Sequence, residues 1–135
     1  MTISAKNFKE YTGAGEVSND FGDCMHRYIV HGLQPGGGFS AILAGDLHRA
    51  VQSLHIRTRE YMAPLTEWVI FCAPPGCYGS YEAIDKWCDD VNGVRSDYVK
   101  YLVAEIAQYR LSGEHPRNMI HGRFEGYGEQ KFYTM

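Results

Sequence analysis

The stretch that most constrains the fold is residues 33–54, LQPGGGFSAILAGDLHRAVQSL, in which a glycine turn leads into a helical pattern. From residue 39 onward the apolar residues recur at intervals of three and four, which places them on one face of a helix. They are Phe39, Ile42, Leu43, Leu47, Ala50, Val51 and Leu54. The pattern therefore predicts one helix over 39–54, whose apolar stripe other helices must cover.

Four further helices are predicted over residues 19–31, 58–73, 81–92 and 95–112. Gly32 is expected to follow the first of them in a left-handed conformation, and Ser80 to cap the helix over 81–92. Pro64 lies inside the helix over 58–73, and we expect a kink there because the apolar stripe keeps its phase across it. The alternative is that the regular part of this helix begins at Pro64.

The domain organisation follows from where these patterns begin and end. A chain of 135 residues is long enough for one domain with a proper core. Residues 1–18 show no sustained period and are expected to form a flexible lead-in. Residues 19–113 are predicted to form a single all-α domain, a compact bundle of about five helices. Residues 114–135 are predicted to form an irregular, aromatic-rich C-terminal tail that docks on the domain or on another subunit.

Charge and hydropathy narrow the classes of partner. The 13 Lys and Arg against 16 Asp and Glu give a formal charge of −3, which is unfavourable for binding duplex nucleic acid. No run of about 18 apolar residues is present, so a transmembrane helix is not expected. The N-terminal residues lack the apolar region of a secretory signal. We therefore expect a cytoplasmic protein with its four cysteines reduced.

The glycine turn is the first candidate binding element. Backbone N–H groups of Gly36, Gly37 and Gly38 precede a helix, an arrangement suited to binding an anion. The turn lacks the Lys-Ser/Thr pair of a phosphate-binding loop, and no strand precedes it. The competing interpretation is structural, because glycines also allow two helices to pack closely through a tight corner.

Metal binding and catalysis have weaker support in the sequence. His48 and His55 are seven residues apart, which on a helix means about 10 Å along the axis, too far to share one ion. We therefore expect no metal and no cofactor. Cys77, in the PPGCYGS loop, is expected to be the one exposed thiol, and a thiol enzyme would need His48 or His55 as its base. No catalytic residue is assigned.

Both glycine-containing loops come just before a predicted helix N-terminus, where backbone donors are available. We therefore expect the contact surface to combine the first turn, the polar face of the helix over 39–54 and the PPGCYGS loop. The candidate binding residues are Gly36, Gly37, Gly38, Asp46, His48, Arg49, Cys77, Tyr78 and Ser80.

Residues 28–88 carry a series of motifs at characteristic positions. They are Tyr28-Ile29-Val30-His31-Gly32, Pro35-Gly36-Gly37-Gly38-Phe39, Ala41-Ile42-Leu43-Ala44-Gly45-Asp46-Leu47, Trp68, Pro74-Pro75, Tyr78-Gly79-Ser80 and Trp87. In this combination the chain resembles a family of short proteins encoded by tailed bacteriophages and prophages. It departs from that family by having Gly45 where asparagine is common, and by its fifth helix and tail. The resemblance implies a phage accessory protein acting in the bacterial cytoplasm.

Three functions are compatible with these features. The leading hypothesis is a small phage-encoded binding protein that modulates a host protein or host defence by stoichiometric binding. The first alternative is sequestration of a small anionic, nucleotide-type ligand without turnover. The second is a small hydrolase that depends on a thiol or histidine. The expected partners are a host protein or a small anionic ligand, together with further copies of the chain in a homo-oligomer. Duplex nucleic acid and membranes are not expected partners.

Overall fold

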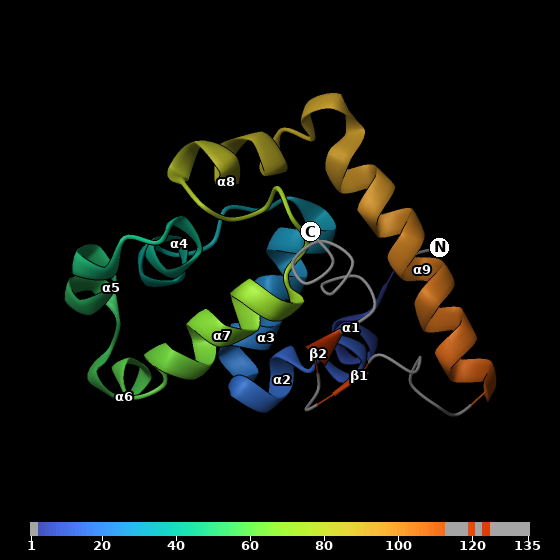
Figure 1. The fold of residues 1–135 in the computed structure, drawn as a ribbon, viewed down its shortest axis with the longest axis horizontal. Helices are drawn as coiled ribbons and strands as arrows, with labels where there is room; N and C mark the ends of the chain where they lie inside the picture. The colour runs from blue at the N-terminus through green and yellow to red at the C-terminus, as the bar shows by residue number, and fades with distance from the viewer. Residues whose placement is uncertain (1–2, 113–118, 121–122, 125–135) are drawn as a thin grey trace.

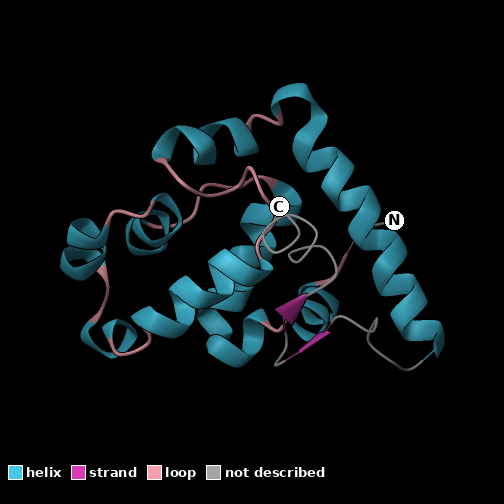
Figure 2. Cartoon of the chain, in the orientation of Figure 1, coloured by secondary structure: helices cyan, strands magenta, loops and turns pink. Residues whose placement is uncertain are grey.

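Short helices follow one another along most of the chain in the computed structural model, which describes residues 3–112, 119–120 and 123–124 (Figures 1 and 2). The fold is all-α, as predicted. The α-helices are α1 (Ala5–Thr12), α2 (Ala14–Val17), α3 (Asn19–Met25), α4 (Gly37–Ala44), α5 (Leu47–Ser53), α6 (Ile56–Arg59), α7 (Met62–Cys72), α8 (Tyr81–Cys88) and α9 (Val94–Ser112). A π-helix, η1 (His26–Val30), continues α3, and a 3₁₀ turn, η2 (Val91–Gly93), precedes α9.

The core draws large side chains from most of these helices. Those almost completely withdrawn from solvent include Phe8, Tyr11, Phe21, Met25, Tyr28, Ile29, Leu43, Leu65, Ile84, Trp87 and Leu102. Polar tips of buried rings are paired: the Tyr28 hydroxyl donates to the Cys77 carbonyl at 2.7 Å, and Trp87 Nε1 to the Ile29 carbonyl at 3.2 Å. Among the described residues, none of the helices has the length and apolar character needed to cross a membrane.

The N-terminal residues differ from the flexible lead-in expected over 1–18, because residues 5–17 are almost entirely helical. The Ser4 hydroxyl caps α1 by accepting from the Asn7 N–H at 3.1 Å, and Gly13 ends the helix in a left-handed conformation. Phe8 and Tyr11, three residues apart, lie on one face of α1 and are fully buried. The apolar stripe of α1 is too short to produce a sustained period in the sequence.

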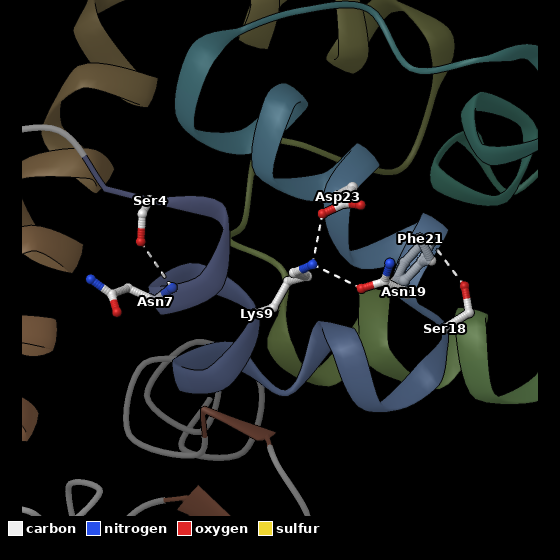
Figure 3. A network of polar contacts seen from close by, with 7 residues as sticks. All are labelled: Ser4, Asn7, Lys9, Ser18, Asn19, Phe21 and Asp23. Carbon is white, nitrogen blue, oxygen red and sulfur yellow. Dashed lines mark hydrogen bonds and ion pairs between the residues drawn. The ribbon is translucent and has the colours of Figure 1, made fainter.

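A lysine joins this N-terminal segment to α3 (Figure 3). Lys9 Nζ lies 2.8 Å from the Asp23 carboxylate and donates at 2.8 Å to the Asn19 side-chain oxygen. The aliphatic stem of Lys9 passes over Gly15 and Gly22, where α2 and α3 approach closely. Packing of the stem and pairing of the ammonium group therefore act together to hold α1 on α3.

Replacing Gly22 with alanine is expected to destabilise this junction. A Cβ atom there would lie 2.7 Å from Lys9 Cδ and 3.1 Å from the Gly15 Cα, closer than van der Waals contact allows. Overpacking of this kind costs about 1–3 kcal/mol of unfolding free energy. Urea unfolding followed by circular dichroism would measure it. An unchanged midpoint would show that α2 and α3 do not depend on the close approach.

The helix predicted over 19–31 begins at Asn19, and Ser18 caps it by accepting from the Phe21 N–H at 3.0 Å. Its second half is the π-helix η1, an uncommon widened turn that sequence periodicity does not predict. Gly32 follows with φ of +70°, the left-handed conformation expected. The next residues lead into the glycine turn and α4.

The single helix predicted over 39–54 is wrong, because the chain breaks it into α4 and α5. Gly45 adopts a left-handed conformation with φ of +78° and ends α4. Asp46 then starts α5 by accepting the Arg49 N–H at 3.1 Å. The break redirects the apolar stripe, so Leu47 is 68% exposed and Val51 is 42% exposed, where both were expected to be buried.

The kinked helix predicted over 58–73 is also replaced by two helices, α6 and α7. Pro64 is the third residue of α7, so the backbone N–H that proline lacks would have had no partner within the helix. The alternative interpretation, a helix that begins near Pro64, is therefore the better one. It places the helix start two residues too late, since α7 begins at Met62.

The last two predicted helices are present with changed bounds. Ser80 caps α8 as expected, accepting from the Ala83 N–H at 3.0 Å. This helix ends at Cys88, before the predicted end at residue 92, because Asp90 and Asn92 adopt left-handed conformations. Helix α9 begins one residue before its predicted start.

The described part of the predicted tail consists of two short strands. β1 (Met119–Ile120) pairs antiparallel with β2 (Arg123–Phe124), and β2 lies against α7 and α1. This position agrees with docking of these residues on the domain. The rest of the tail predicted over 114–135 lies outside the described residues, as do residues 1–2 of the lead-in.

Candidate functional site

The two loops expected to form a contact surface are joined through α4. The Gly79 N–H donates to the Leu43 carbonyl at 2.8 Å, which attaches the PPGCYGS loop to α4. On the other side, the Gln34 amide donates to the Asp85 carboxylate at 2.9 Å and connects the residues before the glycine turn to α8. Helices α4, α5 and α8 therefore present adjoining residues to solvent.

Asp46, Arg49 and Tyr81 form the polar centre of this surface. The Tyr81 hydroxyl donates to Asp46 Oδ2 at 2.8 Å, and the Arg49 guanidinium carbon lies 5.3 Å from the centroid of the Tyr81 ring. The hydrogen bond from Tyr81, followed by that from the Arg49 backbone, lowers the pKa of Asp46. Desolvation, followed by the bond to Asp46, raises the pKa of Tyr81. The three residues are thus in direct contact with one another.

Arg49 also connects this centre to the glycine turn. A Cβ atom built on Gly37 would lie 3.9 Å from Arg49 Nη2, so the guanidinium group stands beside the turn. His48 is exposed next to Asp46, and its electrostatic influence is a smaller cause of the lowered Asp46 pKa. Among the residues proposed from the sequence, Asp46, His48, Arg49 and Gly37 are therefore close together.

The three consecutive glycines have different surroundings. A Cβ atom on Gly38 would lie 2.4 Å from Leu54 Cδ2, so packing against the end of α5 requires a glycine there. A Cβ atom on Gly36 would have no atom within 4 Å, and Gly36 caps α4 without a side chain. The structural interpretation of the turn therefore holds for Gly38 but does not explain the other two.

The turn forms one wall of a cavity of about 400 Å³. Its other walls come from the start of α3 and its cap, the end of α5, and the segment from α6 to α7. The apolar part of its surface includes Phe39, Leu54 and Leu65, while Tyr61 and His55 lie nearer to solvent. The sequence did not indicate this cavity, because its walls come from segments that are distant along the chain.

The PPGCYGS loop contributes less to the exposed contact surface than expected. Cys77 is fully buried, and burial raises the pKa of its thiol well above the usual value. The prediction of an exposed, reactive Cys77 is therefore wrong: the loop folds inward, and the Cys77 carbonyl accepts from the buried Tyr28 hydroxyl. Tyr78 is half-buried, and burial raises its pKa to about 12. Ser80 is engaged as the cap of α8.

Tyr81 is the functional candidate that sequence reasoning missed. Its position directly after the Ser80 cap was visible, but its bond to Asp46 depends on how α8 packs against α4. In the part of the chain that the structure describes, no three His, Cys, Asp or Glu side chains are grouped closely enough to hold a metal ion.

Comparison of the chain with protein families, curated proteins and solved structures gives no match. The candidate site therefore depends on its own geometry and on the sequence motifs.

Proposed function

We propose that this chain is a phage-encoded accessory protein that acts in the bacterial cytoplasm by stoichiometric binding to a host protein. The observation that carries the proposal is the Asp46–Arg49–Tyr81 centre on an exposed surface beside α5. Tyrosine and arginine are among the residues that most often dominate binding energies at protein interfaces. Arg49 lies over the Tyr81 ring, a contact that restricts both side chains, so binding would cost less side-chain entropy.

Helix α5 also exposes two apolar residues, on a different face from Arg49, and these support a protein partner. Leu47 and Val51 are one helical turn apart on α5, and both extend into solvent. Of the residues of α5, Ala50 is the one that is buried. We define the α5 surface as Asp46, Arg49 and Tyr81, which are in direct contact. Tyrosine and arginine are residue types enriched at protein interfaces. We expect the chain to self-associate through other surfaces.

The alternative of a thiol-dependent hydrolase loses support from the burial of Cys77. A nucleophilic thiol must reach its substrate and must ionise, whereas Cys77 is withdrawn from solvent and its pKa is raised. Stoichiometric binding requires neither property and remains the better explanation of the exposed groups.

The test is to purify tagged full-length protein from infected or expressing bacteria, identify the protein that accompanies it, and measure its affinity by calorimetry. We expect Arg49→Ala and Tyr81→Phe each to weaken binding, Arg49→Ala by about tenfold to a hundredfold, because both disrupt the ordered centre. Lys100→Ala, at an exposed position on α9, is the matched control and should bind normally. Equal affinities of all variants would exclude the α5 surface.

A second candidate function is sequestration of a small anionic ligand. The specific observation in its favour is the position of Arg49 beside Gly37, a residue of the cavity wall. Arginine is suited to bidentate pairing with phosphate groups. Sequestration predicts saturable binding without chemical change of the ligand.

A further inference from the structure

The cavity behind the glycine turn has the size and lining of a small-molecule site. Its volume of about 400 Å³ falls within the range of roughly 300–1,000 Å³ typical of ligand pockets. Phe39, Leu54 and Leu65 give it apolar walls, and Phe39 is held in place by an edge-to-face contact with Phe21 at 5.3 Å. A rigid apolar wall of this kind suits a flat, weakly polar ring.

Gly36 and Gly37 line this cavity although nothing within the chain requires glycine at either position. Gly36 has φ of −65° and ψ of 166°, values that any residue adopts, and Gly37 also lacks a positive φ. Added Cβ atoms would clash with nothing at Gly36 and would make only ordinary contact with Arg49 at Gly37. Gly37, the first residue of α4, is less favourable there than alanine by up to about 1 kcal/mol, and Gly36, the N-cap, is less favourable than serine by a few tenths of a kcal/mol. A ligand that lies directly on the backbone would explain both glycines.

The polar lining indicates which ligand groups the cavity could bind. Hydroxyl groups of Ser53 and Thr58 both donate and accept hydrogen bonds, and the carboxylate of Asp20 only accepts. The Ser18 hydroxyl already accepts from the Phe21 N–H as the cap of α3, so it is available mainly as a donor. Such a set fits a ring that carries amino or hydroxyl donors. The exposed Tyr61 ring adds a second aromatic surface on which a planar group can stack. Arg49, beside Gly37, could pair with a phosphate attached to that ring system.

We propose that this cavity binds a nucleoside-type ligand, with the base over Gly36 and Gly37 against Phe39 and with any phosphate next to Arg49. The proposal deepens the second candidate function and rests on it. In this arrangement the cavity holds the base. Arg49 contacts the phosphate and so distinguishes a nucleotide from its nucleoside.

The test is isothermal titration of the full-length protein with the four ribonucleoside 5′-monophosphates, the corresponding nucleosides and inorganic phosphate. At least one nucleotide is expected to bind saturably, with one molecule per chain. Arg49→Ala should weaken binding of that nucleotide by at least tenfold and leave binding of its nucleoside unchanged. The double variant Gly36→Ser/Gly37→Ala should weaken both by at least tenfold.

The glycine variants separate loss of binding from loss of folding. Serine is a preferred helix N-cap and alanine is a better helix former than glycine, so the double variant should keep or raise the thermal midpoint. Gly38→Ala should instead lower the midpoint, because its Cβ would meet Leu54. Gln52→Ala, exposed on α5 beside the cavity residue Ser53, is the matched control and should bind normally.

Four outcomes would overturn the proposal or its premise. Absence of binding by all nucleosides and nucleotides at millimolar concentration would overturn it, and so would binding that the double glycine variant leaves unchanged. Inorganic phosphate binding as tightly as the nucleotides would show an anion site without a base pocket. Recovery of a chemically altered nucleotide would overturn sequestration, the second candidate function, while supporting the cavity as the binding site. The affinity for a protein partner is measured separately, so failure here leaves the first proposed function standing.

Discussion

Replacing Trp68 with alanine should lower the free energy of unfolding by about 3–5 kcal/mol, the range for removing a buried tryptophan. Trp68 lies on α7 at 4% exposure, in edge-to-face contact with Phe21 at 5.4 Å. Its Nε1 donates to the Thr12 carbonyl at 2.9 Å, which connects α7 to the end of α1. Because small domains are stable by only about 5–15 kcal/mol, we expect a sharply lowered urea midpoint.

Trp68→Phe separates packing from hydrogen bonding at this position. It keeps an aromatic ring beside Phe21 but removes the donor to the Thr12 carbonyl, so a smaller loss of about 1–3 kcal/mol is expected. If the alanine variant unfolded at the wild-type midpoint, the N-terminal helices would not be packed on α7 as the structure has them.

The second large effect is expected at Arg95, the half-buried first-turn residue of α9. Its guanidinium group donates to the carbonyls of Trp87 at 3.1 Å, Val30 at 3.3 Å and Cys88 at 3.4 Å. These carbonyls lie at the C-terminal ends of α8 and η1, where a positive charge also interacts favourably with the helix dipoles. Arg95→Ala should therefore cost about 2–3 kcal/mol in urea unfolding.

A double-mutant cycle with Gly32 tests this assignment further. A Cβ atom on Gly32 would lie 2.7 Å from the Arg95 guanidinium carbon, in addition to the strain of its φ of +70°. Gly32→Ala should therefore destabilise the wild type more than it destabilises Arg95→Ala, where only the backbone strain of roughly 1–2 kcal/mol remains. If the effects of the two substitutions on the unfolding free energy were additive, Gly32 and Arg95 would not be in contact. Arg95→Lys, which keeps the charge but not the forked donor, should fall between the wild type and Arg95→Ala.

Signals contained within a few residues were predicted well. Ser80 as a cap and Gly32 as a left-handed helix terminus each follow from local backbone chemistry, and both are confirmed. The all-α fold was equally accessible from the spacing of apolar residues. Where two local interpretations competed, the sequence did not decide between them. Gly45 and Asp46 are a helix stop followed by a helix start, but the apolar stripe continues across them and favoured one helix.

The candidate site was predictable only in part, for the same reason. Asp46 and Arg49 lie three residues apart and were found together, whereas the addition of Tyr81 depends on how three helices pack. The burial of Cys77 likewise depends on Tyr28, a residue from a distant helix. Proline and glycine around Cys77 indicated a turn correctly but could not show which of its side chains face inward.

The widened turn η1 has a consequence for how chains of this type can vary in length. A π-helical turn accommodates one more residue than an α-helical turn between its hydrogen-bonded groups. Deleting one residue from His26–Val30 would therefore allow an unbroken α-helix, at little cost in local hydrogen bonding. It would also remove one residue from a segment that buries Tyr28, Ile29 and Val30, so the helices before the turn would meet those after it through different side chains. A related chain one residue shorter here could keep every helix and still differ in how its N-terminal helices pack on the rest of the core.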